Sequence, residues 1–265
     1  MDNRIASRFV RALLVAVALL ASAAEAQITN INDAINKAGS LRYTANRLAK
    51  AYFQLGMGVD VERSKRILDT AIPMYDRRLV ELKNYSPTPE IKETYVALEK
   101  AWIGYKDLLV GSVPNQANGR KVLPLSEEIV AIANKATGQL ATHSNSNQGK
   151  LVNISGRQRM LSQRIAKYSQ AIAWDVAPAG SQKEIDASKA EFVKMLGELM
   201  AAKENTQQIR DELELGNQQW MFFDSALAGK NADKKVNMTN VATTSERILE
   251  VMDNVVGMYE RLSAK

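Results

Sequence analysis

A segment near the start of the chain recurs 117 residues later, and this duplication constrains the fold more than any other sequence feature. Residues 35–50 align with residues 152–167, so the pattern Asn-x-x-Gly-x-x-Arg occurs twice. The identical positions are Asn36 and Asn153, Gly39 and Gly156, Arg42 and Arg159, Arg47 and Arg164, Ala49 and Ala166, and Lys50 and Lys167.

Further matches at a similar offset lie far from this segment. Trp102 aligns with Trp220, the pair Ser126-Glu127 with Ser245-Glu246, and Gly138 with Gly257. Because the matches come in the same order at both ends of the unit, we infer that the whole unit was copied.

Helix is predicted nearly throughout. The chain is rich in good helix formers, and its 6 Pro and 14 Gly residues gather at a few breaks, with a less certain one at Gly216. The intervals are helix-length and show apolar periodicity without strand-like alternation. The predicted fold class is therefore all-α, with two antiparallel four-helix-bundle repeats packed as an intrachain pseudo-dimer. The predicted helices span residues 28–57, 59–85, 88–110, 120–142, 147–176, 181–214, 217–228 and 234–262.

The N-terminus is typical of a secretory signal peptide. Arg4, Arg8 and Arg11 precede a short apolar stretch, and Ala24-Glu25-Ala26 is an A-x-A cleavage site. We expect residues 1–26 to be removed and the mature chain to be periplasmic, with an uncleaved N-terminal anchor as the alternative. No later segment reaches the ~20 apolar residues of a membrane span. The predicted domains are repeat 1 (27–142), a polar linker (143–149) and repeat 2 (150–265).

The linker decides how the two copies meet. It is rich in turn-forming residues, which favours a chain reversal that makes the first helices of both copies parallel. The alternative is one continuous rod, which would separate the two motifs and leave any shared site to a homodimer.

Each motif helix carries two stripes. In the second copy Leu151, Leu161 and Ile165 lie on an apolar stripe that suits the core of its own bundle. Beside it runs a stripe of small residues that includes Arg159, with Arg42 on the equivalent line of the first copy. Small residues allow close approach, so we expect the two copies to pack through these stripes.

That packing would bring Arg42 and Arg159 together. Two buried guanidinium groups repel, and an anion between them would replace repulsion with charge-assisted hydrogen bonds. A planar oxyanion such as nitrate or nitrite fits guanidinium geometry, and Gly39 and Gly156 leave room beside the backbone. The alternative is that each arginine pairs with a carboxylate from another helix.

Four other motif residues are secondary candidates for the anion site. They are Asn36, Asn153, Arg47 and Arg164. The last two lie off the small stripe, which favours ion pairs or solvent over ligand contact.

The motif resembles a known family. Residues 35–42 are similar to the ligand-binding box of the periplasmic domain of nitrate/nitrite sensor kinases (NarX-like). Residues 156–165 are similar to the N-terminal domain of type IV pili methyl-accepting chemotaxis transducers (PilJ-like). The resemblance implies a four-helix bundle with the motif on its first helix, and one nitrate held between the arginines of a dimer. The resemblance implies that Arg42 and Arg159 correspond to the nitrate-binding arginine of that family, and that Gly39 and Gly156 correspond to the glycine near it.

Two hypotheses of function follow. The first is a periplasmic accessory protein that binds or senses nitrate or nitrite and has no output domain of its own. The second is a ligand-free module that docks to a membrane chemoreceptor, sensor kinase or type IV pilus component. With 0 Cys and 1 His the chain offers no catalytic residues, metal site or cofactor motif. The net charge of +6 could suggest a nucleic-acid partner, but the predicted export argues against one.

Overall fold

The computed structural model describes residues 28–229 and 233–262, and the predicted signal peptide 1–26 lies outside them. Within these ranges every regular element is a helix, as the sequence predicts. The helices are α2 (Ile31–Met57), α3 (Val61–Tyr85), α4 (Pro89–Gly111), α5 (Gln116–Ser144), α6 (Asn147–Ala173), α7 (Gln182–Met200), α8 (Gln207–Leu227) and α9 (Lys234–Glu260).

Short polar caps set most helix starts. The side chain of Asn30 accepts hydrogen bonds from two backbone N–H groups of α2, and Thr88 and Asn115 cap α4 and α5 in the same way. These caps satisfy backbone donors that have no partner inside the helix. Gly58 ends α2 in the left-handed region at φ 65°, a conformation that costs glycine little.

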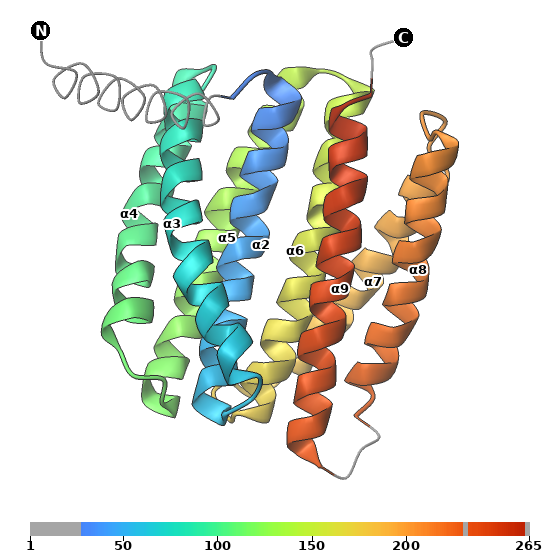
Figure 1. Cartoon of the computed structure of the whole chain (residues 1–265). Helices are drawn as coiled ribbons and strands as arrows, with labels where there is room; N and C mark the ends of the chain where they lie inside the picture. Colours follow the sequence, from blue (N-terminus) through green and yellow to red (C-terminus); the bar gives the residue numbers. More distant parts are fainter. Residues whose placement is uncertain (1–27, 230–232, 263–265) are drawn as a thin grey trace, which may run out of the picture.

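The helices form two four-helix bundles (Figure 1). In repeat 1, α2 packs against α3 and α5, and α4 packs against α3 and α5. Repeat 2 has the same plan, with α6 against α7 and α9, and α8 against α7 and α9. The connections are short and reverse the chain, so neighbouring helices in each bundle are antiparallel.

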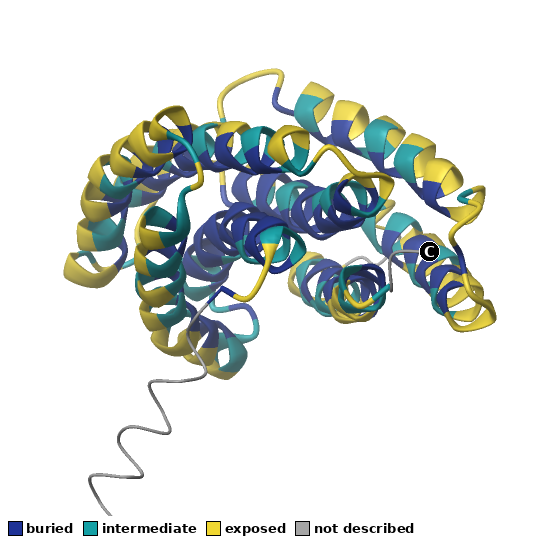
Figure 2. Ribbon diagram, turned by 90° about the horizontal axis from the view of Figure 1, so that it is seen from above, coloured by how far each residue is buried: buried dark blue, intermediate teal, exposed yellow. Residues whose placement is uncertain are grey.

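The two bundles meet through their first helices, which confirms the predicted pseudo-dimer. The helices α2 and α6 pack against each other and start at the same end of the molecule (Figure 1). At that end Asn36 and Gln148 both hydrogen-bond the last turn of α9. Seen from above, exposed residues lie on the outer sides of the peripheral helices, while the centre is buried (Figure 2).

A tight turn separates the repeats. Residues of the predicted linker extend α5 and α6 and leave only Asn145 and Ser146 between the helices. Asn145 takes a left-handed conformation at φ 45°, which asparagine tolerates, and the Ser146 hydroxyl accepts from the N–H of Gly149. The continuous rod is therefore excluded, and the chain reverses as the turn-forming residues favour.

One predicted pair of helices is wrong. The sequence predicts helices 181–214 and 217–228, but α7 ends at Met200 and α8 runs through Gly216. The break lies at residues 201–206 because Asn205 Nδ2 donates to the carbonyl of Leu199 at 2.7 Å, and Thr206 caps α8. Gly216 instead lets α8 approach α9, since a Cβ there would lie 3.4 Å from the sulfur of Met252.

Matching aromatic clusters fill both bundle cores. Trp102 stacks on Tyr75 at 3.9 Å between ring centroids and meets Tyr105 edge-on. In repeat 2, Trp220 stacks on Phe192 at 4.3 Å and meets Phe223 edge-on. The tryptophans are core residues, as their positions on the third helices predict.

At the end of the bundles opposite that last turn of α9, Trp174 packs into a space that two glycines leave. A Cβ at Gly56 would lie 2.0 Å from the Trp174 ring, and one at Gly119 would lie 2.7 Å from it. The indole also contacts Phe53, with ring centroids 5.9 Å apart. This tryptophan therefore joins α6 of repeat 2 to α2 and α5 of repeat 1.

No helix in the described ranges is both long enough and apolar enough to cross a membrane.

Replacing Gly56 by Ala tests this joint. The added methyl group collides with the indole, so Gly56→Ala is expected to lower the free energy of unfolding by about 1–3 kcal/mol. Gly138→Ala is the matched control, because a Cβ there meets nothing within 4 Å. It is expected to stabilise α5 by up to ~1 kcal/mol through helix propensity. Urea unfolding measures both, and equal effects of the two changes would contradict the contact.

Candidate functional site

The two motif helices cross at their glycines. A Cβ built on Gly39 would lie 3.8 Å from the Cα of Gly156 and 3.2 Å from the Nη2 atoms of both Arg42 and Arg159. The structure therefore brings together the four residues that the sequence singles out for the anion site. The guanidinium groups themselves fill the room beside the glycine backbones.

Each arginine hydrogen-bonds the motif asparagine of the other repeat. Arg42 Nη1 donates to Asn153 Oδ1 at 3.0 Å, and Arg159 Nη2 donates to Asn36 Oδ1 at 2.8 Å. Both arginines also reach the backbone carbonyl of the same asparagine, at 3.2 and 3.3 Å. The secondary candidates Asn36 and Asn153 thus take part in the site as acceptors, in a reciprocal arrangement around the crossing.

The fourth helices break this symmetry. Arg159 Nη1 donates to the carboxylate of Asp253 on α9, whereas Arg42 Nη1 donates to the amide oxygen of Asn134 on α5 at 3.2 Å. Asp253 and Asn134 are equivalent at the offset of 119 residues that relates Glu246 to Glu127. The carboxylate alternative therefore holds for Arg159 alone.

Arg42 is a buried cation whose hydrogen bonds go to uncharged acceptors. Arg42 is 1% exposed, and its Nε atom has no hydrogen-bond acceptor among the described residues. Burial lowers the pKa of Arg42, and the charges of Arg157 and Arg159 lower it further, to about 9. The group stays protonated at neutral pH, so repeat 1 holds an uncompensated positive charge.

A groove of about 240 Å³ leads toward this charge between α5, α6 and α7. Asn134 and Arg157 form part of its lining, and Asn134 Oδ1 accepts from both Arg157 Nη1, at 2.7 Å, and Arg42 Nη1. Arg157 also pairs with Glu191 across the groove. The Asn134 side chain links the groove to the buried guanidinium.

The secondary candidates Arg47 and Arg164 form ion pairs with the opposite repeat. Arg47 Nη2 lies 2.5 Å from Glu246, and Arg164 Nη2 lies 2.6 Å from Glu127. Of the two alternatives to ligand contact, ion pairs or solvent, the structure shows ion pairs.

Two buried lysines complete these clusters. Lys50 Nζ donates to Glu246 at 2.6 Å and to Ser245 Oγ at 3.0 Å. Lys167 donates equivalently to Glu127 and to Ser126 Oγ. Burial lowers the pKa of Lys167 to about 8, a shift that Glu127 opposes. The two clusters brace each motif helix against the fourth helix of the other repeat.

Five residues of the candidate site were not predicted from the sequence. They are Asn134, Asp253, Arg157, Lys50 and Lys167. The lysines stood in the repeated segment without an assigned role, and Asn134 and Asp253 follow from extending the alignment of Glu127 with Glu246 by seven residues. No group of His, Cys, Asp and Glu suited to a metal ion occurs in the described part of the chain.

Fold and site together define a duplicated four-helix-bundle domain that pairs one motif helix from each repeat around buried arginines. A family model described as type IV pili methyl-accepting chemotaxis transducer N-term (PilJ) matches residues 23–122 and 140–244. The chain therefore belongs to the PilJ family, with one match in each half. No curated protein and no solved structure matches the chain.

The family match confirms the pilus-transducer part of the resemblance. The matched family is described as the N-terminal domain of a signal transducer, and this description supports a sensory rather than a catalytic role. The likeness to nitrate sensor kinases, and with it the ligand, stays a prediction.

The pH dependence of stability tests the ion clusters. Burial raises the pKa of Glu127 and Glu246, but the charges of the lysine and arginine on each outweigh burial and hold both values at about 2. Since an unfolded glutamate titrates at about 4.3, this stabilisation is present above that pH and is lost as the pH falls toward 2.

Glu246→Gln is expected to cost about 3 kcal/mol at pH 7 and roughly half as much at pH 3, where the folded carboxylate is still mostly ionised. Urea unfolding at both values measures the difference. Glu62→Gln, in an exposed pair with Lys65, is the control and should change stability little at either pH. A Glu246→Gln cost that is unchanged at pH 3 would contradict this account.

Proposed function

We propose that the chain is a periplasmic sensing accessory that binds a small monovalent oxyanion beside Arg42, with nitrate or nitrite as the leading ligand. The observation that carries this proposal is the buried guanidinium of Arg42, which has no carboxylate partner in the described structure. Burying such a charge is costly unless an anion or a set of strong acceptors compensates it.

The charges around the crossing favour a single negative charge. Three guanidinium groups, those of Arg42, Arg157 and Arg159, face two carboxylates, those of Glu191 and Asp253. One positive charge is left over, and it lies on the Arg42 side. A monovalent anion neutralises it, whereas a divalent anion leaves a buried negative charge.

Two amide oxygens stand where such an anion would bind. Asn134 and Asn153 both accept from Arg42 Nη1, and an oxyanion offers the same acceptor chemistry with a charge added. Guanidinium presents parallel donors in a plane, which suits one edge of nitrate. The groove beside Asn134 supplies the route, with Arg157 in its lining as a second donor.

Periplasmic location rests on the predicted signal peptide and on the family. The PilJ description is that of the N-terminal part of a transducer. We therefore propose that the chain reports anion occupancy to an envelope receptor or kinase.

The second candidate is a ligand-free docking module. Val96, Ile103 and Val110 recur every seven residues on α4 and are 52%, 52% and 69% exposed. Such a stripe suits a helical partner in a membrane chemoreceptor or pilus component. If no anion changes the melting temperature of the protein, the docking module is favoured over the anion-binding accessory.

A thermal-shift screen tests the anion. Nitrate at ~100 times its dissociation constant should add about 2.7 kcal/mol and raise the melting temperature by several degrees. Sulfate should do less, because it is divalent. Arg42→Ala and Arg159→Ala should abolish the shift. No response to millimolar nitrate, nitrite or chlorate would sink the proposal.

A single isosteric change tests which side holds the anion. Asn134→Asp places a carboxylate on Arg42, so the variant should be about 1–3 kcal/mol more stable without nitrate and should lose the nitrate response. Asp253→Asn is the matched control: it should be less stable and keep the response. A nitrate shift of wild-type size in Asn134→Asp would contradict the assignment to Arg42.

A further inference from the structure

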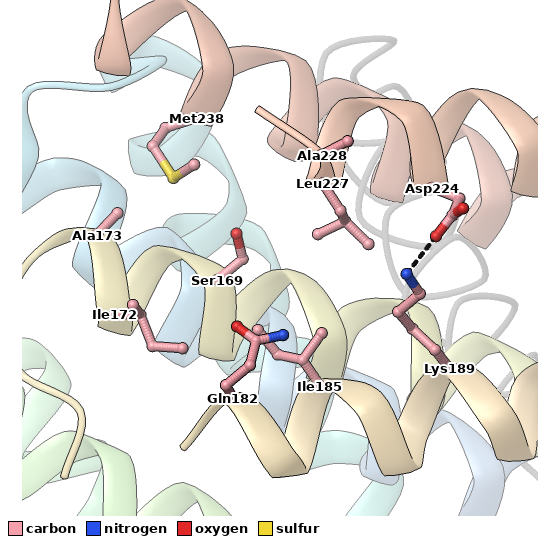
Figure 3. A pocket seen from close by; sticks show the side chains of 10 residues that line it. All are labelled: Ser169, Ile172, Ala173, Gln182, Ile185, Lys189, Asp224, Leu227, Ala228 and Met238. Carbon is pink, nitrogen blue, oxygen red and sulfur yellow. Dashed lines mark ion pairs between the residues drawn. The ribbon is translucent and has the colours of Figure 1, made fainter. Parts of the chain in front are cut away.

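A second cavity lies within repeat 2, away from the paired arginines. It has a volume of about 340 Å³, is partly open to solvent, and is lined by residues of α6, α7, α8 and α9 and by Ala228, which follows α8 (Figure 3). Its apolar lining includes Ile172, Ile185, Leu227 and Met238, and Figure 3 shows these side chains around Ser169. Its wall is about equally polar and apolar, so a cavity of this size suits a small organic ligand that carries both an apolar part and charged groups.

Repeat 1 fills the corresponding position with a side chain. The offset of 117 residues that relates Arg42 to Arg159 also relates Tyr52 to Ser169. Tyr52 is fully buried, and its hydroxyl donates to the carbonyl of Val113 at 3.1 Å. The smaller Ser169 leaves space at this position of repeat 2, so the cavity arises from divergence between the copies.

An ion pair stands beside the apolar wall. Lys189 Nζ lies 2.5 Å from Asp224 Oδ1, and their side chains are 34% and 47% exposed (Figure 3). At the offsets that align the surrounding core residues, Lys189 corresponds to Ile72 of repeat 1 and Asp224 to Lys106. Lys106 forms its ion pair with a different residue. The pair is therefore a feature of repeat 2 alone, like the cavity.

We propose that this cavity binds a free α-amino acid with an apolar side chain. The adjacent opposite charges match a zwitterion, with Lys189 taking the carboxylate and Asp224 the ammonium group. The ligand would replace one exposed ion pair by two. Its side chain would lie among Ile185, Leu227 and Met238, beside the Ser169 hydroxyl. This proposal is independent of the anion site, which lies at the crossing of α2 and α6.

Calorimetry on the mature chain in nitrate-free buffer provides the test. L-leucine and L-phenylalanine should bind, while leucinamide and 4-methylpentanoate, which lack one of the two charges, should bind at least tenfold more weakly. Failure of every L-amino acid to bind at millimolar concentration would overturn the proposal. Equal binding of leucine and 4-methylpentanoate would overturn the zwitterion assignment.

Variants of two residues that line the cavity locate the site. Ser169→Tyr restores the residue of repeat 1 and should abolish leucine binding. Lys189→Met should weaken it at least tenfold through loss of the carboxylate partner, and this variant decides the matter if Ser169→Tyr does not fold. Lys106→Met is the control on repeat 1 and should bind leucine as the wild type does. Undiminished binding by Lys189→Met would refute this site.

Discussion

The close crossing of α2 and α6 is the constraint on which the rest of the structure depends. It holds the motif glycines almost in contact and buries two guanidinium groups beside them. Buried charges need partners, and the chain supplies them reciprocally, from the asparagine of the opposite motif to each arginine.

The outer helices then serve the crossing. They cover the apolar sides of α2 and α6, while Glu127 and Glu246 on the fourth helices brace the opposite motif helix through Lys167 and Lys50. Because the arginine–asparagine and lysine–glutamate contacts cross between the repeats, the two halves should act as one cooperative unit. A chain with two copies thereby provides in one polypeptide an interface that would otherwise need a dimer.

Much of this arrangement follows from the duplicated sequence. Two identical motifs on small-residue stripes predict a pair of first helices in contact, and the turn-forming residues around Asn145 predict their parallel direction. Both features are confirmed by the structure. Arg42 and Arg159 meet as the stripes predict, while their role in holding a ligand stays a prediction.

The missed features depend on contacts between distant segments. Local pattern alone placed a helix break at Gly216, where glycine actually serves packing against Met252. The duplication contained a better signal, since Thr206 aligns with the helix cap Thr88 at the offset that relates the two tryptophans. The different partners of Arg42 and Arg159 could not be predicted from local pattern either, because these partners lie far away in the sequence. Arg42 contacts a residue 92 positions away, and Arg159 contacts one 94 positions away.

The copies have kept their scaffold and diverged at a few points, and these are the points where we propose that ligands bind. Asn134 against Asp253 leaves one arginine without a counter-ion, and Ser169 against Tyr52 opens a cavity in one bundle only. The lysine clusters, in contrast, recur in both copies, each with a glutamate and a serine of the fourth helix of the other repeat.

Crystal structures determined with and without sodium nitrate would test the central claim most directly. The account predicts planar density bonded to the guanidinium of Arg42 in the nitrate crystals, with an asparagine side chain turned away from Nη1. Unchanged contacts from Asn134 and Asn153 to Arg42, with no added density there, would contradict it.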